Sequence, residues 1–232
     1  ILGALLPIDL PTKAGLLMMA ISPLAPFVSA KMMNSGDTAY GVGIYTALIL
    51  AAVVVVPLTV AVLNPFYARH ATISVAAIAR LVLESILIPL MAGIAFRALF
   101  PEVARRAGPV AMLVAYAALA PVVALFLYKS SGQVVGLIGN GALVAIIGTV
   151  LAGLAAGHWL GGPDPVHRVA LAQAAATRHP GIAALIAEGS FKDEPQIKVG
   201  IVLFLLVGII LTTLYFAWNK RQLAQSARLL SQ

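Results

Sequence analysis

Two adjacent polar residues stand in the middle of an apolar stretch in the last third of the chain. Arg178 and His179 lie within residues 171–188, which read LAQAAATRHPGIAALIAE. A cation at membrane depth is costly unless it is paired or hydrated, so an intramembrane Arg indicates a functional site. A guanidinium can hold a carboxylate or phosphate through two hydrogen bonds at once. These residue types therefore favour recognition of an anion, with Thr177 beside them as a further candidate.

The same stretch contains a helix break. Pro180 removes a backbone donor and clashes with the preceding turn, and Gly181 follows it. We therefore expect two half-helices that meet here instead of one straight helix. Irregular backbone at membrane depth persists only where protein or a water-filled cavity surrounds it.

A second interrupted stretch lies near the N-terminus. Residues 20–34 read AISPLAPFVSAKMMN, in which Pro23 and Pro26 interrupt an apolar run and Lys31 follows. A short charged turn and then a long apolar helix, 42–62 or 199–217, follow each interrupted stretch. Interrupted helices at matching positions in two halves indicate inverted repeats with a binding site between them. The alternative is that the prolines only kink their helices.

Composition places these stretches in a polytopic membrane protein. Hydrophobic residues make up 61% of the 232, and charged residues only 10%, whereas soluble domains are about 45–50% apolar. The net charge of +7 comes mostly from Lys and Arg in short loops, which is typical of topology signals and speaks against nucleic-acid binding. Cysteine is absent, which excludes disulfides and thiol chemistry.

Seven apolar segments reach the roughly 20 residues that a membrane helix needs. They are residues 12–34, 38–63, 73–99, 107–128, 136–160, 166–188 and 197–218. Segments 12–34 and 166–188 are the least uniformly apolar, and a re-entrant course is the alternative for both. Basic residues in the loops place Arg97, Arg105 and Arg106 on the side of the C-terminus, which we expect to be cytoplasmic.

Short motifs around the two breaks resemble those of the bile acid:sodium symporter family. The first is Ser22-Pro23, then Ser29-Ala30-Lys31, then the turn Ser35-Gly36-Asp37-Thr38-Ala39 before a long apolar helix. The second is Thr177-Arg178-His179-Pro180-Gly181-Ile182-Ala183, which is similar to the Gln-Asn-Ser-Gly-Leu-Ala pattern of the family's second crossover.

This resemblance implies an all-α transmembrane fold of ten helices in two inverted five-helix repeats. Two broken helices would cross in a core domain, with a panel domain beside it. Residues 1–63 would then be the end of the first repeat, with helices like the family's fourth and fifth. Residues 64–232 would form the second repeat, and the family's first three helices would be missing from this sequence.

The sequence departs from the family at the positions that hold sodium. Ala174 stands where an acidic residue is usual, and Arg178 and His179 stand where Gln and Asn are usual. Sodium needs several hard oxygen ligands, so fixed cations are expected to replace it. The residues expected to bind an anion are Lys31, Arg178, His179, Ser29, Thr177, Ser22 and, by the resemblance, Thr46.

Other polar residues in apolar segments have simpler explanations. Glu84 follows Arg80 by four residues, the spacing of a helical ion pair, although a proton relay is the alternative. His158 beside Trp159 is expected to be an interfacial anchor. No set of catalytic or metal-ligating side chains shares one membrane depth. We therefore expect no enzyme activity, no cofactor and no metal.

These features together predict a secondary transporter of small organic anions that works by alternating access without sodium. The expected location is the plasma membrane, as in a bacterial inner membrane, with lipid as the surrounding partner and a homodimer as an open alternative. Three other functions stay open: an anion-sensing module of a larger protein, a sodium-coupled symporter and a passive channel.

Overall fold

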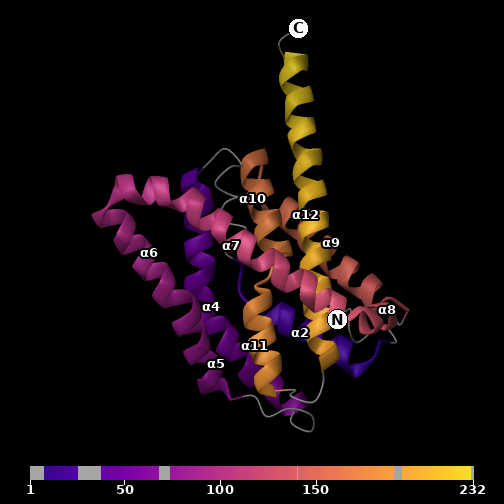
Figure 1. Ribbon diagram of the computed structural model, residues 1–232. Coiled ribbons are helices and arrows are strands. Elements are labelled where there is room, and N and C mark those ends of the chain that lie inside the picture. The colour runs from indigo at the N-terminus through magenta and orange to yellow at the C-terminus, as the bar shows by residue number, and fades with distance from the viewer. Residues whose placement is uncertain (1–7, 26–37, 68–73, 140, 191–194, 231–232) are drawn as a thin grey trace.

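The computed structural model of the chain describes residues 8–25, 38–67, 74–139, 141–190 and 195–230. All regular structure in these ranges is helical (Figure 1). The elements in order are α2 (Leu10–Ile21), α4 (Thr38–Tyr67), α5 (Val75–Val82), the π-helix η1 (Leu83–Leu87), α6 (Ile88–Leu99), α7 (Pro101–Lys129), α8 (Ser131–Gly139), α9 (Ala142–Leu160), α10 (Pro165–Ala176), α11 (Pro180–Ser190) and α12 (Pro195–Leu230). The expected all-α transmembrane fold is confirmed.

Five helical stretches of the described chain are long and apolar enough to cross a membrane. They are Ala39–Val62, Val75–Leu99, Pro101–Lys129, Ala142–Leu160 and Gln196–Gln222. Each corresponds to one of the predicted segments. The two remaining segments, 12–34 and 166–188, are the interrupted ones, and α2, α10 and α11 have only 11 or 12 residues each.

Side chains at the helix starts explain where several helices begin. The Asp9 carboxylate accepts a hydrogen bond from the Thr12 amide of α2 at 3.1 Å, and the Asp164 carboxylate accepts one from the Val166 amide of α10 at 2.7 Å. Ser74 caps α5 in the same way through the Ala77 amide. Each cap satisfies one of the amides that a helix leaves unpaired at its first turn.

Several boundaries differ from the predicted segments, and two of these differences change how the chain is divided into helices. The predicted span 136–160 is divided at Gly141, whose φ of 84° is left-handed, so α8 is separate from α9. Glycine adopts this conformation without a steric penalty. The predicted loop 100–108 is mostly helical, because α7 already begins at Pro101, where proline suits the first helical position.

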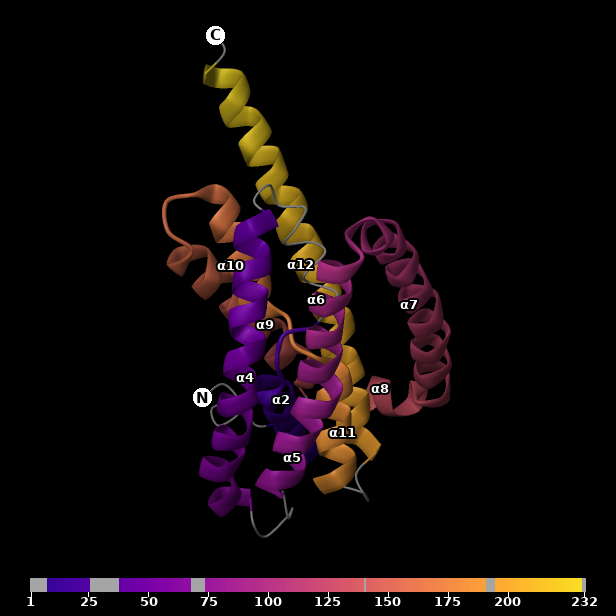
Figure 2. The ribbon, with the colours of Figure 1, turned by 90° about the vertical axis from the view of Figure 1, so that its left-hand side faces the viewer.

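The buried core lies where α2, α9, α11 and α12 meet. Met18, Val150, Ile182, Ile197 and Ile201 are among its most buried side chains. The helices α6 and α7 contain no buried residue, and α7 forms the outer edge of the molecule in Figure 2. An apolar surface of this kind suits a membrane environment.

The helices α9 and α10 pack closely, because glycines leave room for the backbone of α10. A Cβ built on Gly153 would lie 2.9 Å from the Ala175 carbonyl oxygen, and one on Gly157 would overlap the Cα atom of Ala172. Gly161, four residues further, faces the backbone of Arg168 in the same way. Small residues at a spacing of four let membrane helices approach closely. This ridge of Gly153, Gly157 and Gly161 fixes the position of α10.

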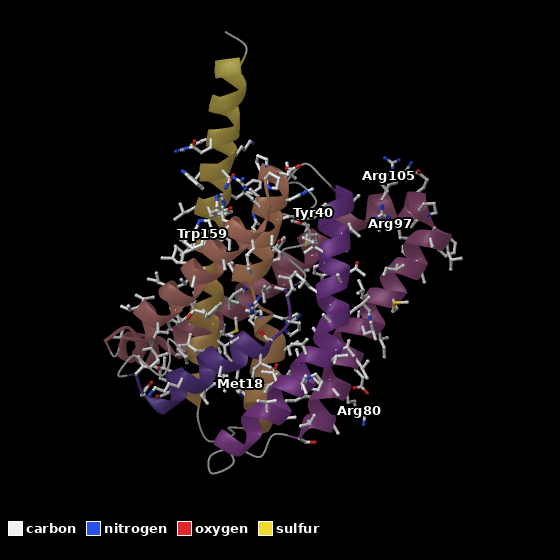
Figure 3. The ribbon with its side chains drawn as sticks, turned by 180° about the vertical axis from the view of Figure 1, so that it is seen from behind. Met18, Tyr40, Arg80, Arg97, Arg105 and Trp159 are labelled. Carbon is white, nitrogen blue, oxygen red and sulfur yellow. The ribbon has the colours of Figure 1, made fainter. Side chains whose placement is uncertain are left out.

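The end of the molecule that carries Arg97 and Arg105 is also the end from which α12 projects (Figure 3). Arg80 lies at the opposite end in Figure 3. This arrangement agrees with the grouping of Arg97 and Arg105 with the C-terminus. The inverted repeat, the division after residue 63 and the cytoplasmic side of the C-terminus stay predictions.

The glycine ridge gives a stability prediction. Gly157→Ala should lower the thermal midpoint of the purified protein, because the new methyl group has no room and such overpacking costs about 1–3 kcal/mol. Gly93 of α6 has open space around its Cα. Gly93→Ala should therefore leave the midpoint unchanged or raise it, since Ala is the better helix former. Equal thermal midpoints for the two variants would contradict the close packing of α10 on this ridge.

The topology can be tested with single cysteines, because the chain has none of its own. Arg105 and Lys129 lie near opposite ends of α7, with about 36 Å of helix between them. Cysteines at these two positions should react with an impermeant maleimide from opposite faces of the membrane. Arg97→Cys is the control and should label from the same face as Arg105→Cys. Labelling of positions 105 and 129 from one face would contradict the membrane course of α7.

Candidate functional site

The helix break expected near Pro180 is confirmed. The helix α10 ends at Ala176, and Thr177 has extended backbone with φ −106° and ψ 137°. The helix α11 begins at Pro180, where the missing proline N–H is not needed. Gly181, which was expected to belong to the break, lies inside the first turn of α11. The irregular backbone is therefore confined to Thr177, Arg178 and His179.

A backbone hydrogen bond joins this break to the first interrupted stretch. The His179 amide donates to the Pro23 carbonyl oxygen at 2.8 Å. The helix α2 has ended just before, and Ser22 closes it: its hydroxyl donates to the Met19 carbonyl at 2.8 Å. The two interrupted stretches are therefore in direct contact at Pro23 and His179. Pro26, Ser29 and Lys31, which were also expected at this site, lie outside the described residues.

Arg178 closes the end of α10. Its Nη1 atom donates to the carbonyl oxygens of Ala174 and Thr177, both at 3.2 Å. A cation at a helix C-terminus also interacts favourably with the helix dipole. The Glu188 carboxylate on the following helix forms an ion pair with Lys198, at 3.3 Å. Within the described ranges no carboxylate forms an ion pair with Arg178.

His179 closes the start of α11 and was not expected to do so. Its Nδ1 atom accepts a hydrogen bond from the Ile182 amide at 3.3 Å, and its carbonyl oxygen accepts one from the Ala183 amide at 3.1 Å. This arrangement requires the tautomer with the proton on Nε2. The imidazole therefore serves the backbone at the position where an anion ligand was predicted.

Two cavities flank the break, and Arg178 lines both. The first, the α12 cavity, lies between α2, α7, α10 and α12 and has a volume of about 310 Å³. The second, the α4 cavity, lies between the end of α2, α4 and α10 and also has a volume of about 310 Å³. Arg178 is partly buried between them. One cation is therefore reachable from two separate spaces.

The side chains around the two cavities differ in chemistry. The α12 cavity is mostly apolar, with polar groups at Tyr116, Gln173, Thr177, Arg178 and Thr212. The α4 cavity is lined by aliphatic residues, Pro23, Ser22 and Arg178. Of the described side chains that line the α4 cavity, only Ser22 carries an oxygen, and its proton is donated to Met19.

The sequence-predicted residues are thus brought together in part. Thr177 and Arg178 line the α12 cavity, and Ser22 and Arg178 line the α4 cavity. Thr46 is partly exposed on α4 and lines neither cavity. Gln173 and Thr212 were missed. The spacing of four between Gln173 and Thr177, which puts both on one face of an apolar helix, could have indicated the former.

Two residues outside the site also have definite partners. Arg80 Nε and Glu84 Oε1 are 2.7 Å apart, which confirms the expected ion pair; both side chains are exposed. His158 Nδ1 lies 2.7 Å from the Tyr215 hydroxyl and so ties α9 to α12, while the neighbouring Trp159 points outward (Figure 3). The role of His158 is thus a contact between helices as well as the expected place at a helix end.

The described chain is all-helical, with five helices long and apolar enough to cross a membrane. The break between α10 and α11 contacts the end of α2 and has a cavity on either side, which is typical of membrane transporters built on broken helices. The model of the Sodium Bile acid symporter family matches residues 1–137, more than half of the chain. The chain belongs to this family of membrane transporters. No curated protein matches the sequence. The matched region contains Pro23 and ends in α8, so Arg178 and His179 lie beyond it.

The capping role of His179 can be tested by stability. His179→Ala should lower the free energy of unfolding by about 1 kcal/mol, because the Ile182 amide loses its acceptor. His179→Asn should recover most of the loss, since an Asn side-chain oxygen also caps helices. Thermal unfolding of both variants in detergent gives the comparison. If Asn is no better than Ala, the Nδ1 bond does not stabilise α11.

Proposed function

We propose that the chain carries small organic anions across the membrane by alternating access, without coupling to sodium, and that Arg178 is the main anion-binding residue. The observation that supports this most is the position of Arg178 between the two cavities. An alternating-access transporter must present one binding group first to one side and then to the other. A residue already bordering two separate spaces suits that requirement.

The hydrogen bonds of Arg178 leave it able to bind an anion. Only Nη1 is used by the carbonyls of Ala174 and Thr177. The guanidinium has five N–H donors in a planar fork, and a carboxylate takes two of them in parallel. An anion in either cavity could therefore be held while Nη1 still closes α10.

Size and lining narrow the substrate class. A volume of about 310 Å³ is near the lower end of ligand pockets, which run from roughly 300 to 1,000 Å³. Walls formed largely by Met19, Leu119, Phe204 and Leu205 favour an apolar body. The combination supports a small anion with an apolar portion, and it argues against inorganic ions.

The independence from sodium rests on what surrounds Arg178. Hard cations need several oxygen ligands. The α12 cavity has oxygen-bearing side chains, Gln173 and Thr212 among them, so there the charge of Arg178 alone would exclude sodium. The α4 cavity has the Ser22 hydroxyl as its one described side-chain oxygen. Ala174 beside it has only a methyl group, and the fixed cation repels a second one. The charge of Arg178 would take the place that a bound sodium ion has in a coupled transporter.

The proposal predicts a graded loss of anion binding. We use phenylacetate at pH 7 as the probe, with affinity measured by calorimetry on the purified protein. Arg178→Gln should weaken binding by roughly 10- to 100-fold, as expected for a lost charge-assisted hydrogen bond. Arg178→Lys should restore part of the affinity, because the charge returns without the fork. Arg80→Gln, which removes an exposed arginine elsewhere, is the matched control and should bind as the parent does.

Two further measurements separate the alternatives. Binding and uptake into proteoliposomes should be the same in sodium and in choline chloride, and a requirement for sodium would identify a coupled symporter. Exchange of labelled phenylacetate across the proteoliposome membrane should accompany binding. Binding without exchange would favour the sensing module, and unchanged affinity in Arg178→Gln would place the anion site elsewhere.

A further inference from the structure

Among the residues that the structure describes, none is a hydrogen-bond partner of the Gln173 side chain, although this side chain is buried. It lies on α10, one turn before Thr177, and is 1% exposed. Neither its Nε2 nor its Oε1 atom is paired with another group of the described chain. Buried amides in native proteins are nearly always paired, so an unpaired one requires an explanation. Gln173 is also one of the residues that line the α12 cavity.

The hydrogen bonds that close the end of α10 do not involve this side-chain amide. The backbone carbonyl of Gln173 accepts the Thr177 amide at 3.1 Å and so ends α10 without the side chain. Arg178 donates to Ala174 and Thr177 and not to Gln173. Because Gln173 has no side-chain bond to break, its amide can turn toward the cavity without losing a hydrogen bond to protein.

The unpaired atoms define what a partner must offer. The Nε2 group donates, and the Oε1 atom accepts. Thr212, which lines the same cavity, gives its proton to the Gly208 carbonyl at 2.7 Å, so its oxygen is also left to accept. A simple carboxylate can satisfy Arg178 and Nε2, but it has no donor for Oε1 or for the Thr212 oxygen. A ligand with its own hydroxyl or amide N–H would satisfy both kinds of group.

We propose that Gln173 is a specificity-determining residue that selects, among small organic anions, those with a hydrogen-bond donor in addition to the anionic group, such as hydroxylated carboxylates. This inference rests on the proposed function, because it assigns the charge of the ligand to Arg178. The unpaired amide of the empty protein becomes paired when such a ligand enters the α12 cavity. A carboxylate without a donor leaves Oε1 unpaired in the bound state as well.

The test compares carboxylates that differ by one hydroxyl. The probes are phenylacetate, mandelate and the three hydroxyphenylacetate isomers, which place the donor at different distances from the carboxylate. Affinities are measured by calorimetry on the purified protein. At least one hydroxylated probe should bind about tenfold more tightly than phenylacetate, as expected for one added hydrogen bond. If none binds more tightly, the inference is wrong.

The variant Gln173→Met has nearly the same shape and no amide. Its expected effect is a fall in the ratio of hydroxylated-probe affinity to phenylacetate affinity from about tenfold to near one. It should also raise the thermal midpoint of the ligand-free protein, because an unpaired buried amide is removed. Gln196→Met, the same exchange at an exposed residue of α12, is the matched control and should keep the ratio.

The outcomes separate this inference from the proposed function. Arg178→Gln could weaken the binding of every carboxylate while Gln173→Met keeps the ratio of hydroxylated-probe affinity to phenylacetate affinity. This result would support the anion site and contradict the role of Gln173. A lower thermal midpoint for Gln173→Met would show that the amide is structural and held by water, and it would also overturn the inference. If no carboxylate binds the parent protein, the proposed function fails and this inference fails with it.

Discussion

The structure depends on how a helix break satisfies its own peptide groups inside a membrane. Without water, each unpaired carbonyl or amide costs several kcal/mol. The break after α10 solves this with three neighbouring contacts: Arg178 binds the last carbonyls of α10, His179 binds a first-turn amide of α11, and the Pro23 carbonyl accepts the His179 amide. The polar residues that make this stretch unusual in sequence are therefore first of all the partners of its backbone.

The capping of α10 uses only part of the hydrogen-bonding capacity of Arg178. Its proposed second role, anion binding, depends on this capping. The bonds from Nη1 hold the guanidinium at the point where the α12 and α4 cavities approach each other. Close packing of α10 on Gly153 and Gly157 of α9 keeps the carbonyls of Ala174 and Thr177 in register with it. A binding group whose own position is fixed by its surroundings loses little entropy when a ligand arrives.

Membership in the Sodium Bile acid symporter family rests on residues 1–137, whereas the residues that would set ion use and ligand choice lie on α10 and at the second break. This separation agrees with a general property of folds: one scaffold supports different substrates through a few residues at its site. In this chain a guanidinium at Arg178 and an unpaired amide at Gln173 would give the α12 cavity an affinity for anions, while the methyl group of Ala174 lines the α4 cavity.

Local chemistry alone determined the membrane class, the break before Pro180 and the ion pair of Arg80 with Glu84. Apolar length, a missing proline donor and a spacing of four act within one or two turns of the chain, so the sequence expresses them directly. The separation of α8 from α9 at Gly141, the capping role of His179 and the isolation of the Gln173 amide were decided by the tertiary structure. The ring nitrogen of His179 binds an anion or a backbone amide according to how the two half-helices meet. The amide of Gln173 has or lacks a hydrogen-bond partner according to which residues of α2 and α12 surround it.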